Sequence, residues 1–388
     1  MSGHLPIWWA RSDDDESVGK MRIVLAGRFA GHGGIQTHLR SLAVVLADAR
    51  HDLLLLSFGR APDTEDDARN DSFLNNSGVR LKYLSDSISG RTALGAFLTV
   101  QRAMRSFHPN VYFACGTGWN LFAPAVFKPH RCRFVFHEVM SGEPTGWRDS
   151  RWLVRGFFDF VVAQASPVAW NFERMFGCRR PIPVIPAFPA PLEKASRIPQ
   201  TRQHRVPFGS ARAAMFGRLF PHKRVAWLVT QWPRLNRSLR ELHIFGTGPE
   251  EAPIRKLILE NGWSDSVFCH GSYPDAQAHV DLLSSFDLTL LPTIGAEGSP
   301  LVLLESMACG VPFVATDAGG ISDYANTDCL IVPRDDPEAF LLGVQELSTR
   351  IAEGTIDHRR LQEFYRKRFS FDVLKGEWLS FFELMATA

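Results

Sequence analysis

Short apolar runs alternate with amphipathic stretches along most of the chain. Residues 21–27, MRIVLAG, have the pattern of a buried strand that ends in glycine. The spacing then predicts an amphipathic helix over 35–49 and a second strand over the apolar run at 53–58. A strand, a glycine-containing loop, a helix and another strand in this order are typical of a parallel α/β sheet.

The same rhythm continues to the middle of the chain. Further strands are predicted at 79–84, 111–114, 133–137 and 160–163. Helices are predicted at 91–107, at 147–158 and from the end of the strand at 160–163 to residue 176. After residue 187 the composition shifts toward proline, arginine and polar residues, as in a linker.

The α/β rhythm restarts in the second half. Strands are predicted at 213–216, 242–246, 267–271, 287–292, 311–316 and 329–332, and the last helices at 337–350, 358–368 and 372–385. The predicted fold class is therefore α/β, with two doubly wound domains and a ligand site in the cleft between them. We assign 1–20 to a flexible polar tail, 21–190 to the first domain, 191–210 to the linker and 211–370 to the second domain. A C-terminal helix, 371–388, is expected to pack back on the first domain.

Composition narrows the class of protein. Apolar residues make up 45% and charged residues 22% of the chain, and the net charge is only +2, so nucleic acid is not an expected partner. The six cysteines form no C-x-x-C pair, which argues against zinc and a disulfide framework and favours a reducing cytoplasm. Neither a spanning apolar run nor a signal pattern is evident in this sequence.

The stretch GAEGSPLVLLESMACG, at 295–310, carries the most specific chemistry. Ser299 is expected to cap a helix whose first residue is Pro300. The backbone N–H groups of Leu301 and Val302 would then form a seat for phosphate. Glu305, one turn later among apolar neighbours, either satisfies backbone groups inside the fold or accepts hydrogen bonds from the hydroxyls of a ligand.

Glycine and basic residues supply candidate phosphate contacts. Gly31-x-Gly33-Gly34 follows a strand and opens a helix, and Gly246-x-Gly248 follows another strand. Neither completes G-x-G-x-x-G, which counts against a nicotinamide dehydrogenase and leaves tight turns as the alternative. Arg218 and Lys223 follow a strand of the second domain, where they either compensate a diphosphate or form a solvated basic surface.

Three further features remain open. His137 ends an apolar strand and is either structural or turned toward the cleft. No HExxH occurs, and the only D-x-D lies in the tail, so no metal is expected. Arg148, Arg151 and Arg155 share one face of the helix predicted at 147–158, with Trp152 beside them. That face either contacts anionic lipid or is an ordinary exposed face with one packed aromatic residue.

Taken in order, these motifs resemble those of family 4 glycosyltransferases, which have the GT-B fold. The motifs are GHGGIQTHLRSLAVVLA, FHE at 136, FGRLFPHK at 216, FGTGPEE at 245, EGSPLVLLESMACGVPFVAT at 297 and GGISDY at 319. Two departures are notable. Arg224 stands where the family often has glycine, and Arg50-His51 replaces a common Gly-His, so that Arg50 also stands at a glycine position.

The resemblance implies a retaining, metal-independent transfer of a sugar from a UDP- or GDP-sugar to a glycan or glycolipid acceptor, with no cofactor. The residues implied in catalysis are His137, Glu297, Arg218 and Lys223. His137 would face the transferred sugar, Arg218 and Lys223 would hold the diphosphate, and Glu305 would bind the ribose. The residues implied in nucleotide-sugar binding are Gly33, Gly34, Arg218, Lys223, Gly248, Glu297, Gly298, Ser299, Pro300, Leu301 and Glu305.

The expected role is cell-surface polysaccharide synthesis by a cytoplasmic enzyme, peripheral at the inner face of the cytoplasmic membrane. Two alternatives stay open at this point. A nucleotide-sugar epimerase can share the GT-B fold, and a non-catalytic partner subunit could keep the fold for binding alone.

Overall fold

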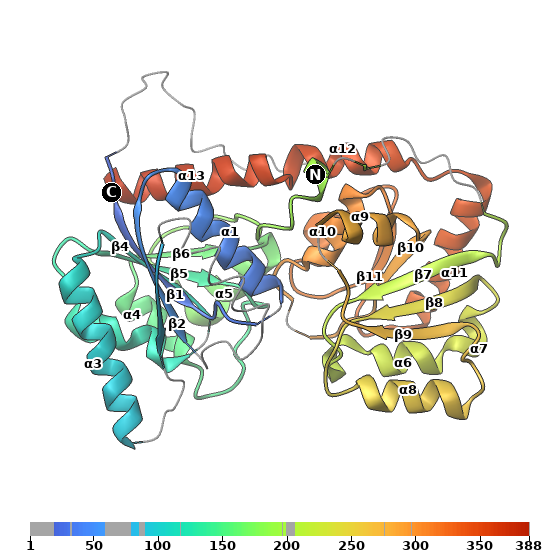
Figure 1. Ribbon diagram of the computed structural model, residues 1–388, viewed down its shortest axis with the longest axis horizontal. Coiled ribbons are helices and arrows are strands. Elements are labelled where there is room, and N and C mark those ends of the chain that lie inside the picture. The colour runs from blue at the N-terminus through green and yellow to red at the C-terminus, as the bar shows by residue number, and fades with distance from the viewer. Residues whose placement is uncertain are drawn as a thin grey trace.

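The computed structural model describes residues 19–31, 33–58, 79–84, 90–116, 118–195, 197–198, 206–274, 276–295 and 297–387. Most of the predicted tail and residues 196 and 199–205 of the predicted linker lie outside this described part. The chain forms two α/β domains, each built on one parallel sheet (Figure 1).

The first sheet has six parallel strands in the order β3-β2-β1-β4-β5-β6, the doubly wound order. Its strands are β1 (Arg22–Gly27), β2 (Asp52–Phe58), β3 (Arg80–Leu84), β4 (Val111–Cys115), β5 (Arg133–Glu138) and β6 (Phe160–Ala163). The accompanying helices are α1 (Gly34–Asp48), α3 (Gly90–Phe107), η1 (Trp119–Phe127) and α5 (Ser166–Phe176). Strands β4 and β6 are buried throughout, as expected of strands covered on both faces.

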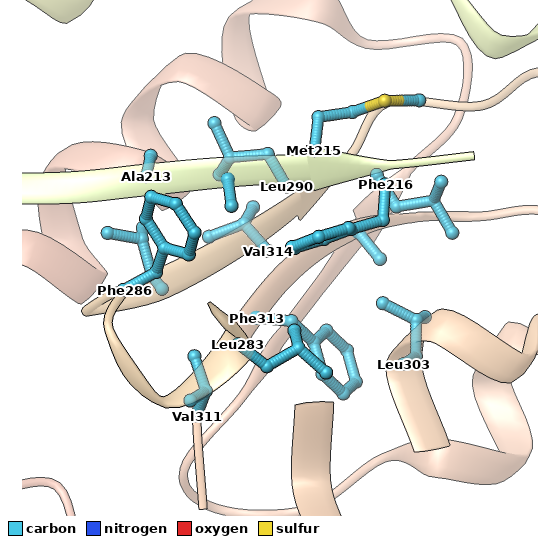
Figure 2. Packing of buried hydrophobic residues seen from close by; sticks show 14 of the residues in the cluster. Ala213, Met215, Phe216, Leu283, Phe286, Leu290, Leu303, Val311, Phe313 and Val314 are labelled. Carbon is cyan, nitrogen blue, oxygen red and sulfur yellow. The ribbon is translucent and has the colours of Figure 1, made fainter. Parts of the chain in front are cut away.

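The second sheet repeats this arrangement with the order β12-β11-β10-β7-β8-β9. Its strands are β7 (Ala211–Phe216), β8 (Leu239–Phe245), β9 (Val267–Gly271), β10 (Leu288–Leu291), β11 (Phe313–Asp317) and β12 (Leu330–Pro333). Its helices are η4 (Pro221–Lys223), α6 (Val225–Thr230), α7 (Trp232–Leu235), α8 (Glu251–Glu260), α9 (Ala276–Ser284), α10 (Leu301–Ala308), η5 (Ile321–Tyr324) and α11 (Pro337–Glu353). Figure 2 shows Phe216 and Phe286 packed with aliphatic side chains of this domain's core.

The two C-terminal helices return the chain to the first domain. After α12 (His358–Arg368), α13 (Phe371–Thr387) runs along the first domain beside α1 (Figure 1). Trp378 and Phe382 of α13 are buried in the core of the first sheet, and Trp378 Nε1 donates to the carbonyl of Pro186 at 3.1 Å. The short helix η3 (Leu192–Lys194) is held to α12, because Tyr365 donates its hydroxyl to Glu193 at 2.8 Å.

The prediction of one helix over 147–158 is wrong. The segment contains only two short pieces, η2 (Ser150–Leu153) and α4 (Val154–Phe157). The reason is Arg151, whose side chain is fully buried and pairs with Glu138 at 2.9 Å and with Asp149 at 2.7 Å. Since Arg151 points inward, it cannot share an exposed face with Arg148, and the proposed three-arginine face does not exist.

Both arginines that replace a family glycine adopt left-handed backbone conformations. Arg50 has φ 63° just before β2, and Arg224 has φ 55° between η4 and α6. Non-glycine residues pay a steric cost in this region, so the glycine preference at these two positions has a direct backbone cause.

Candidate active site

A cleft of about 1090 Å³ lies between the carboxyl ends of the two sheets. This volume slightly exceeds the usual range of small-molecule sites, about 300–1,000 Å³. The first domain contributes Gly27, Arg28, Gly33, Gly34, Cys115, Val139 and Gln164, among others. The second contributes Gly217, Arg218, Lys223, Gly246, Tyr273, His279, Glu297, Gly298, Ser299, Pro300, Leu301, Val302 and Glu305, among others. The cleft therefore brings together ten of the eleven residues named for donor binding, the exception being Gly248.

Two helix N-termini face each other across this cleft. A Cβ built on Gly34, the first residue of α1, would lie 3.4 Å from the side chain of Leu301, the first residue of α10. The free N–H groups and positive dipole ends of both helices thus converge on one region. Arg218 and Lys223 line the same cleft, so this region is suited to bind an anion such as a diphosphate.

Lys223 and Glu297 form an ion pair in which the ammonium group donates to Oε1 of the carboxylate. The side chains are only 14% and 10% exposed, so solvent screens the pair weakly. Thr293 Oγ1 donates to the same oxygen at 2.8 Å. Glu297 is therefore fixed in place, and it neutralises Lys223, one of the cations that line the cleft together with Arg28, Arg40 and Arg218.

Arg218 lines the cleft, whereas His222, the neighbour of Lys223 in the chain, is not among the lining residues. The Arg218 guanidinium lies over the ring of Phe220, 5.2 Å from its centroid. Burial lowers the pKa of His222, and the charge of the adjacent Lys223 lowers it further. His222 thus favours its neutral form, and the positive charge available to an anionic ligand comes from the arginines and the lysine that line the cleft.

Glu305 lies in the cleft and bonds to a side chain. One carboxylate oxygen is 3.1 Å from Nε2 of His279, on α9. The ring of Tyr273 stacks on His279 with centroids 5.1 Å apart, and Phe216 meets both rings edge-on. This end of the cleft combines flat rings with a buried carboxylate, the groups that a base and a ribose would need.

The sequence did not single out His279 or Tyr273. A signal for His279 exists in the sequence, because it falls on the apolar face of α9 beside Val280 and Leu283. A polar residue on a buried face needs a partner, and that partner is Glu305.

Three expectations about individual residues are corrected. Ser299 does not cap α10, because Pro300 occupies the N-cap and the Ser299 hydroxyl lies 2.5 Å from that of Tyr324. Gly248 is not among the residues that line the cleft, and its backbone packs closely against the carbonyl of Leu219. His137, the third residue, needs a fuller description.

His137 does not face the cleft. It is 0% exposed and lies among the rings of His38, Phe113 and Trp378, with centroids 4.9, 5.3 and 5.1 Å away. The neighbouring Val139, two residues along the chain, lines the cleft instead. Burial holds the pKa of His137 well below its usual value, and His38 adds to this effect. The expectation that His137 contacts the transferred sugar is therefore wrong in this structure.

Two features of the residues that the structure describes bear on the expected partners. No group of three or more His, Cys, Asp or Glu side chains is placed to hold a metal ion among these residues. Likewise, none of the helices that the structure describes is both long and apolar enough to span a bilayer.

Two family models match the chain, one on each domain. The model described as Glycosyltransferase Family 4 matches residues 32–188, and that described as Glycosyl transferases group 1 matches residues 211–350. Together they include most of the chain.

Curated relatives match over part of their length. An exopolysaccharide phosphotransferase of Streptomyces coelicolor is 27% identical over 295 residues, 73% of this chain and 29% of that protein. An MMP alpha-(1->4)-mannosyltransferase of Mycolicibacterium hassiacum is 30% identical over 159 residues, 39% of this chain and 36% of that protein. The aligned part is thus less than two fifths of either relative.

Solved structures share the whole architecture. Anabaena HepE in complex with UDP has a TM-score of 0.75 at 16% identity, covering 93% of this chain and 99% of that one. Sucrose-phosphate synthase of Thermosynechococcus elongatus has a TM-score of 0.74 at 16% identity, covering 95% and 100%. At such identity the likeness shows the fold, two facing Rossmann-like domains.

Proposed function

The chain belongs to the family 4-like glycosyltransferases of the GT-B fold, and on that premise we propose that it transfers a sugar from a UDP- or GDP-sugar to a glycan or glycolipid acceptor. We place this reaction in cell-surface polysaccharide synthesis, since relatives named for exopolysaccharide and mannosyl transfer align with the chain. The observation that carries the proposal is the convergence of two helix N-termini, Arg218, Lys223 and Glu305 on one cleft.

In the proposed reaction the bond between the anomeric carbon and the nucleoside diphosphate breaks while the sugar acquires positive charge. The acceptor hydroxyl forms the new bond to that carbon and gives up its proton. Arg218, Lys223 and the N–H groups of α1 and α10 are fixed before the reaction, so they stabilise the leaving group without reorganising. Glu305 accepts hydrogen bonds from the ribose hydroxyls. Aligned in this way, the donor places its sugar beside Glu297.

The ion pair between Lys223 and Glu297 implies an exchange of partners on donor binding. The diphosphate takes over the ammonium group of Lys223, and this frees Glu297 to accept hydrogen bonds from the sugar hydroxyls. Glu297 thus pairs with Lys223 in the empty cleft and with the sugar hydroxyls once the donor is bound.

Retention of the anomeric configuration follows from family membership in this proposal. Proton NMR of the first product distinguishes the outcomes, because the anomeric coupling of the transferred sugar either matches that of the donor or does not. An inverted product contradicts this part of the proposal.

We also propose that no metal is required, because cations that include Arg218 and Lys223, together with two helix N-termini, line the cleft and can offset the diphosphate charge. Turnover is expected to survive EDTA. Complete loss on chelation, with recovery in magnesium or manganese, contradicts metal independence.

A thermal-shift panel of nucleotides and nucleotide sugars tests the proposed donor site. A ligand at 100-fold over its dissociation constant stabilises the folded state by about 2.7 kcal/mol. We expect stabilisation by UDP or GDP in the wild type and much less in Lys223→Ala. Product assays with and without acceptor then separate a transferase from an epimerase, and a binding protein without turnover from both.

We still propose that the protein associates peripherally with the inner face of the membrane, but through a different surface from the three-arginine face. Trp147, Trp152 and Trp170 are 81%, 47% and 58% exposed. Arg148 lies over Trp147 at 4.3 Å, and Arg174 over Trp170 at 4.7 Å. We propose that these aromatic and basic side chains contact anionic lipid.

Binding to phosphatidylglycerol vesicles tests this surface. Binding should weaken with salt and should fall in the pair Arg148→Glu and Arg174→Glu. The matched control is the pair Arg359→Glu and Arg366→Glu, on α12, where both arginines are exposed. Equal binding by both variants contradicts the proposed surface.

A further inference from the structure

A helix of the first domain is capped by a carboxylate of the second domain. Oδ2 of Asp323, in η5, accepts a hydrogen bond of 2.7 Å from the backbone N–H of Ser166, the first residue of α5. The N-cap residue of α5 is Ala165, which has no side chain able to accept a hydrogen bond. The negative charge also lies at the positive dipole end of this 11-residue helix.

Around this hydrogen bond the two domains meet through backbone. A Cβ built on Gly320 would lie 2.4 Å from the Cβ of Ala165. A Cβ built on Gly298 would lie 2.4 Å from the carbonyl oxygen of Val139 and 2.5 Å from Oε1 of Gln164. Real side chains do not tolerate such separations, so these two glycines permit an approach that any other residue would prevent. The contact is therefore built into the backbone of both domains.

The turn that carries Asp323 is also bonded to the stretch 297–300, which we call the donor loop. The N–H of Gly320 donates to the carbonyl of Glu297 at 3.2 Å. The hydroxyl of Tyr324, next to Asp323, lies 2.5 Å from that of Ser299. The N–H of Asp323 also donates to the carbonyl of Gly320 at 3.3 Å. Hydrogen bonds from Glu297 to Gly320, from Gly320 to Asp323 and from Asp323 to Ser166 thus join the cleft to the N-terminus of α5 in the opposite domain.

We propose that Asp323 is a positioning residue that holds the two domains closed and couples the donor loop to that closure. It touches no substrate. When the donor loop is in place, η5 presents the Asp323 carboxylate to α5, and the first domain is held at the distance that transfer needs. The proposal rests on the proposed function only for the identity of the donor.

Two substitutions remove the two partners of this hydrogen bond separately. Asp323→Ala removes the acceptor. Ser166→Pro removes the donor N–H while suiting the first position of a helix. The preceding Ala165 has φ −155° and ψ 157°, the extended conformation that a residue before proline prefers, so α5 should form normally in this variant. The control is Asp335→Ala, whose side chain is 88% exposed.

Hydrogen exchange and small-angle X-ray scattering test the contact without any turnover. In Asp323→Ala the amide of Ser166 should exchange about three- to tenfold faster, since a charged hydrogen bond at a partly exposed site is modest in strength. The radius of gyration should increase in both variants, and UDP or GDP should protect the Ser166 amide in the wild type alone. Unchanged exchange in Asp323→Ala overturns the proposal.

Kinetics test the coupling. Each single variant should lower kcat about three- to tenfold and weaken the Kd of UDP or GDP by no more than the same factor, because nucleotide binding and closure are linked. The double variant should be no worse than either single one. Effects that multiply in the double variant, or a loss confined to nucleotide affinity, overturn it. If no nucleotide sugar is turned over, the proposed function fails, whereas exchange and scattering still decide whether Asp323 closes the domains.

Discussion

Glu305 and His279 lie 3.1 Å apart at the end of the cleft that is rich in aromatic side chains, and their hydrogen bond joins α10 to α9. Both side chains are largely buried, at 11% and 4% exposure. His279 holds one carboxylate oxygen of Glu305 and so orients the other toward the cleft. A buried carboxylate with one oxygen already bonded is prepared to accept hydrogen bonds from a ligand.

Glu305→Gln should lower the affinity for a nucleoside diphosphate by roughly ten- to a hundredfold, because a hydrogen bond to a charged group is worth about 1.5–3 kcal/mol. His279→Phe keeps the ring but cannot orient Glu305, so it should cost less, about threefold to tenfold. Calorimetry with UDP and GDP measures both. Wild-type affinity in Glu305→Gln would show that this carboxylate does not bind the nucleoside.

Lys223 and Glu297 should affect diphosphate affinity in opposite directions. Lys223→Ala removes a cation and should weaken the binding of UDP or GDP much more than that of uridine or guanosine. Glu297→Gln leaves Lys223 without its counter-ion, so the diphosphate should bind about three- to tenfold more tightly while transfer slows. A weaker affinity in Glu297→Gln would contradict the exchange of partners proposed for donor binding.

The buried histidines should make the protein sensitive to acid. Burial lowers the pKa of His38 to about 3, and that of His137 lies well below its usual value. The unfolded chain, with histidine pKa values near 6.5, therefore takes up protons that the folded state does not. The free energy of unfolding should decrease as the pH falls below about 6.5 toward about 3, by up to about 1.4 kcal/mol per pH unit for each histidine.

His137→Phe tests this relation and the location of His137 together. Neither ring nitrogen of His137 has a hydrogen-bond partner among the described atoms, so phenylalanine should fit without leaving a polar group unsatisfied. The loss of stability between pH 6.5 and pH 4 should become smaller, and kcat should change by less than about twofold. A sharp fall in kcat with unchanged stability would place His137 at the reaction after all.

Arg50 offers a test of backbone strain away from the cleft. Its φ of 63° favours glycine, and Arg50→Gly should raise the free energy of unfolding by about 0.5–1 kcal/mol. Arg224→Gly should gain less, because it also loses the contact of the Arg224 guanidinium with the ring of Trp227, 4.7 Å away. Urea denaturation of both variants measures the difference, and destabilisation by Arg50→Gly would contradict the strain.

The sequence was sufficient for the two parallel sheets, since their strands are apolar runs separated by amphipathic helices. It also sufficed to bring Glu297, Glu305, Arg218 and Lys223 to one cleft, because each follows a strand of the same sheet. The direction of a side chain was harder. A strand covered on both faces is apolar at every position, so the pattern could not show that His137 turns toward α13 and away from the cleft.

Contacts between distant residues account for the other errors. Arg151 looked exposed because its partner Glu138 lies 13 residues away, and only their pairing makes burial of the charge tolerable. Serine is a residue type that often caps helices, but the Ser299 hydroxyl is hydrogen-bonded to that of Tyr324, which belongs to a later turn. Asp323 and Ser166 are 157 residues apart, and no local pattern connects them.

The most direct measurement of the central claim is the release of nucleoside diphosphate from a panel of UDP- and GDP-sugars at high enzyme concentration. We expect the wild-type protein to release UDP or GDP from at least one donor, even without acceptor and slowly, through hydrolysis. Glu305→Gln should need more donor for the same rate, and Lys223→Ala should be slowed at every donor concentration. Release from no donor, or release at equal rates by the wild type and Lys223→Ala, would contradict the claim that this cleft transfers a sugar from a nucleotide.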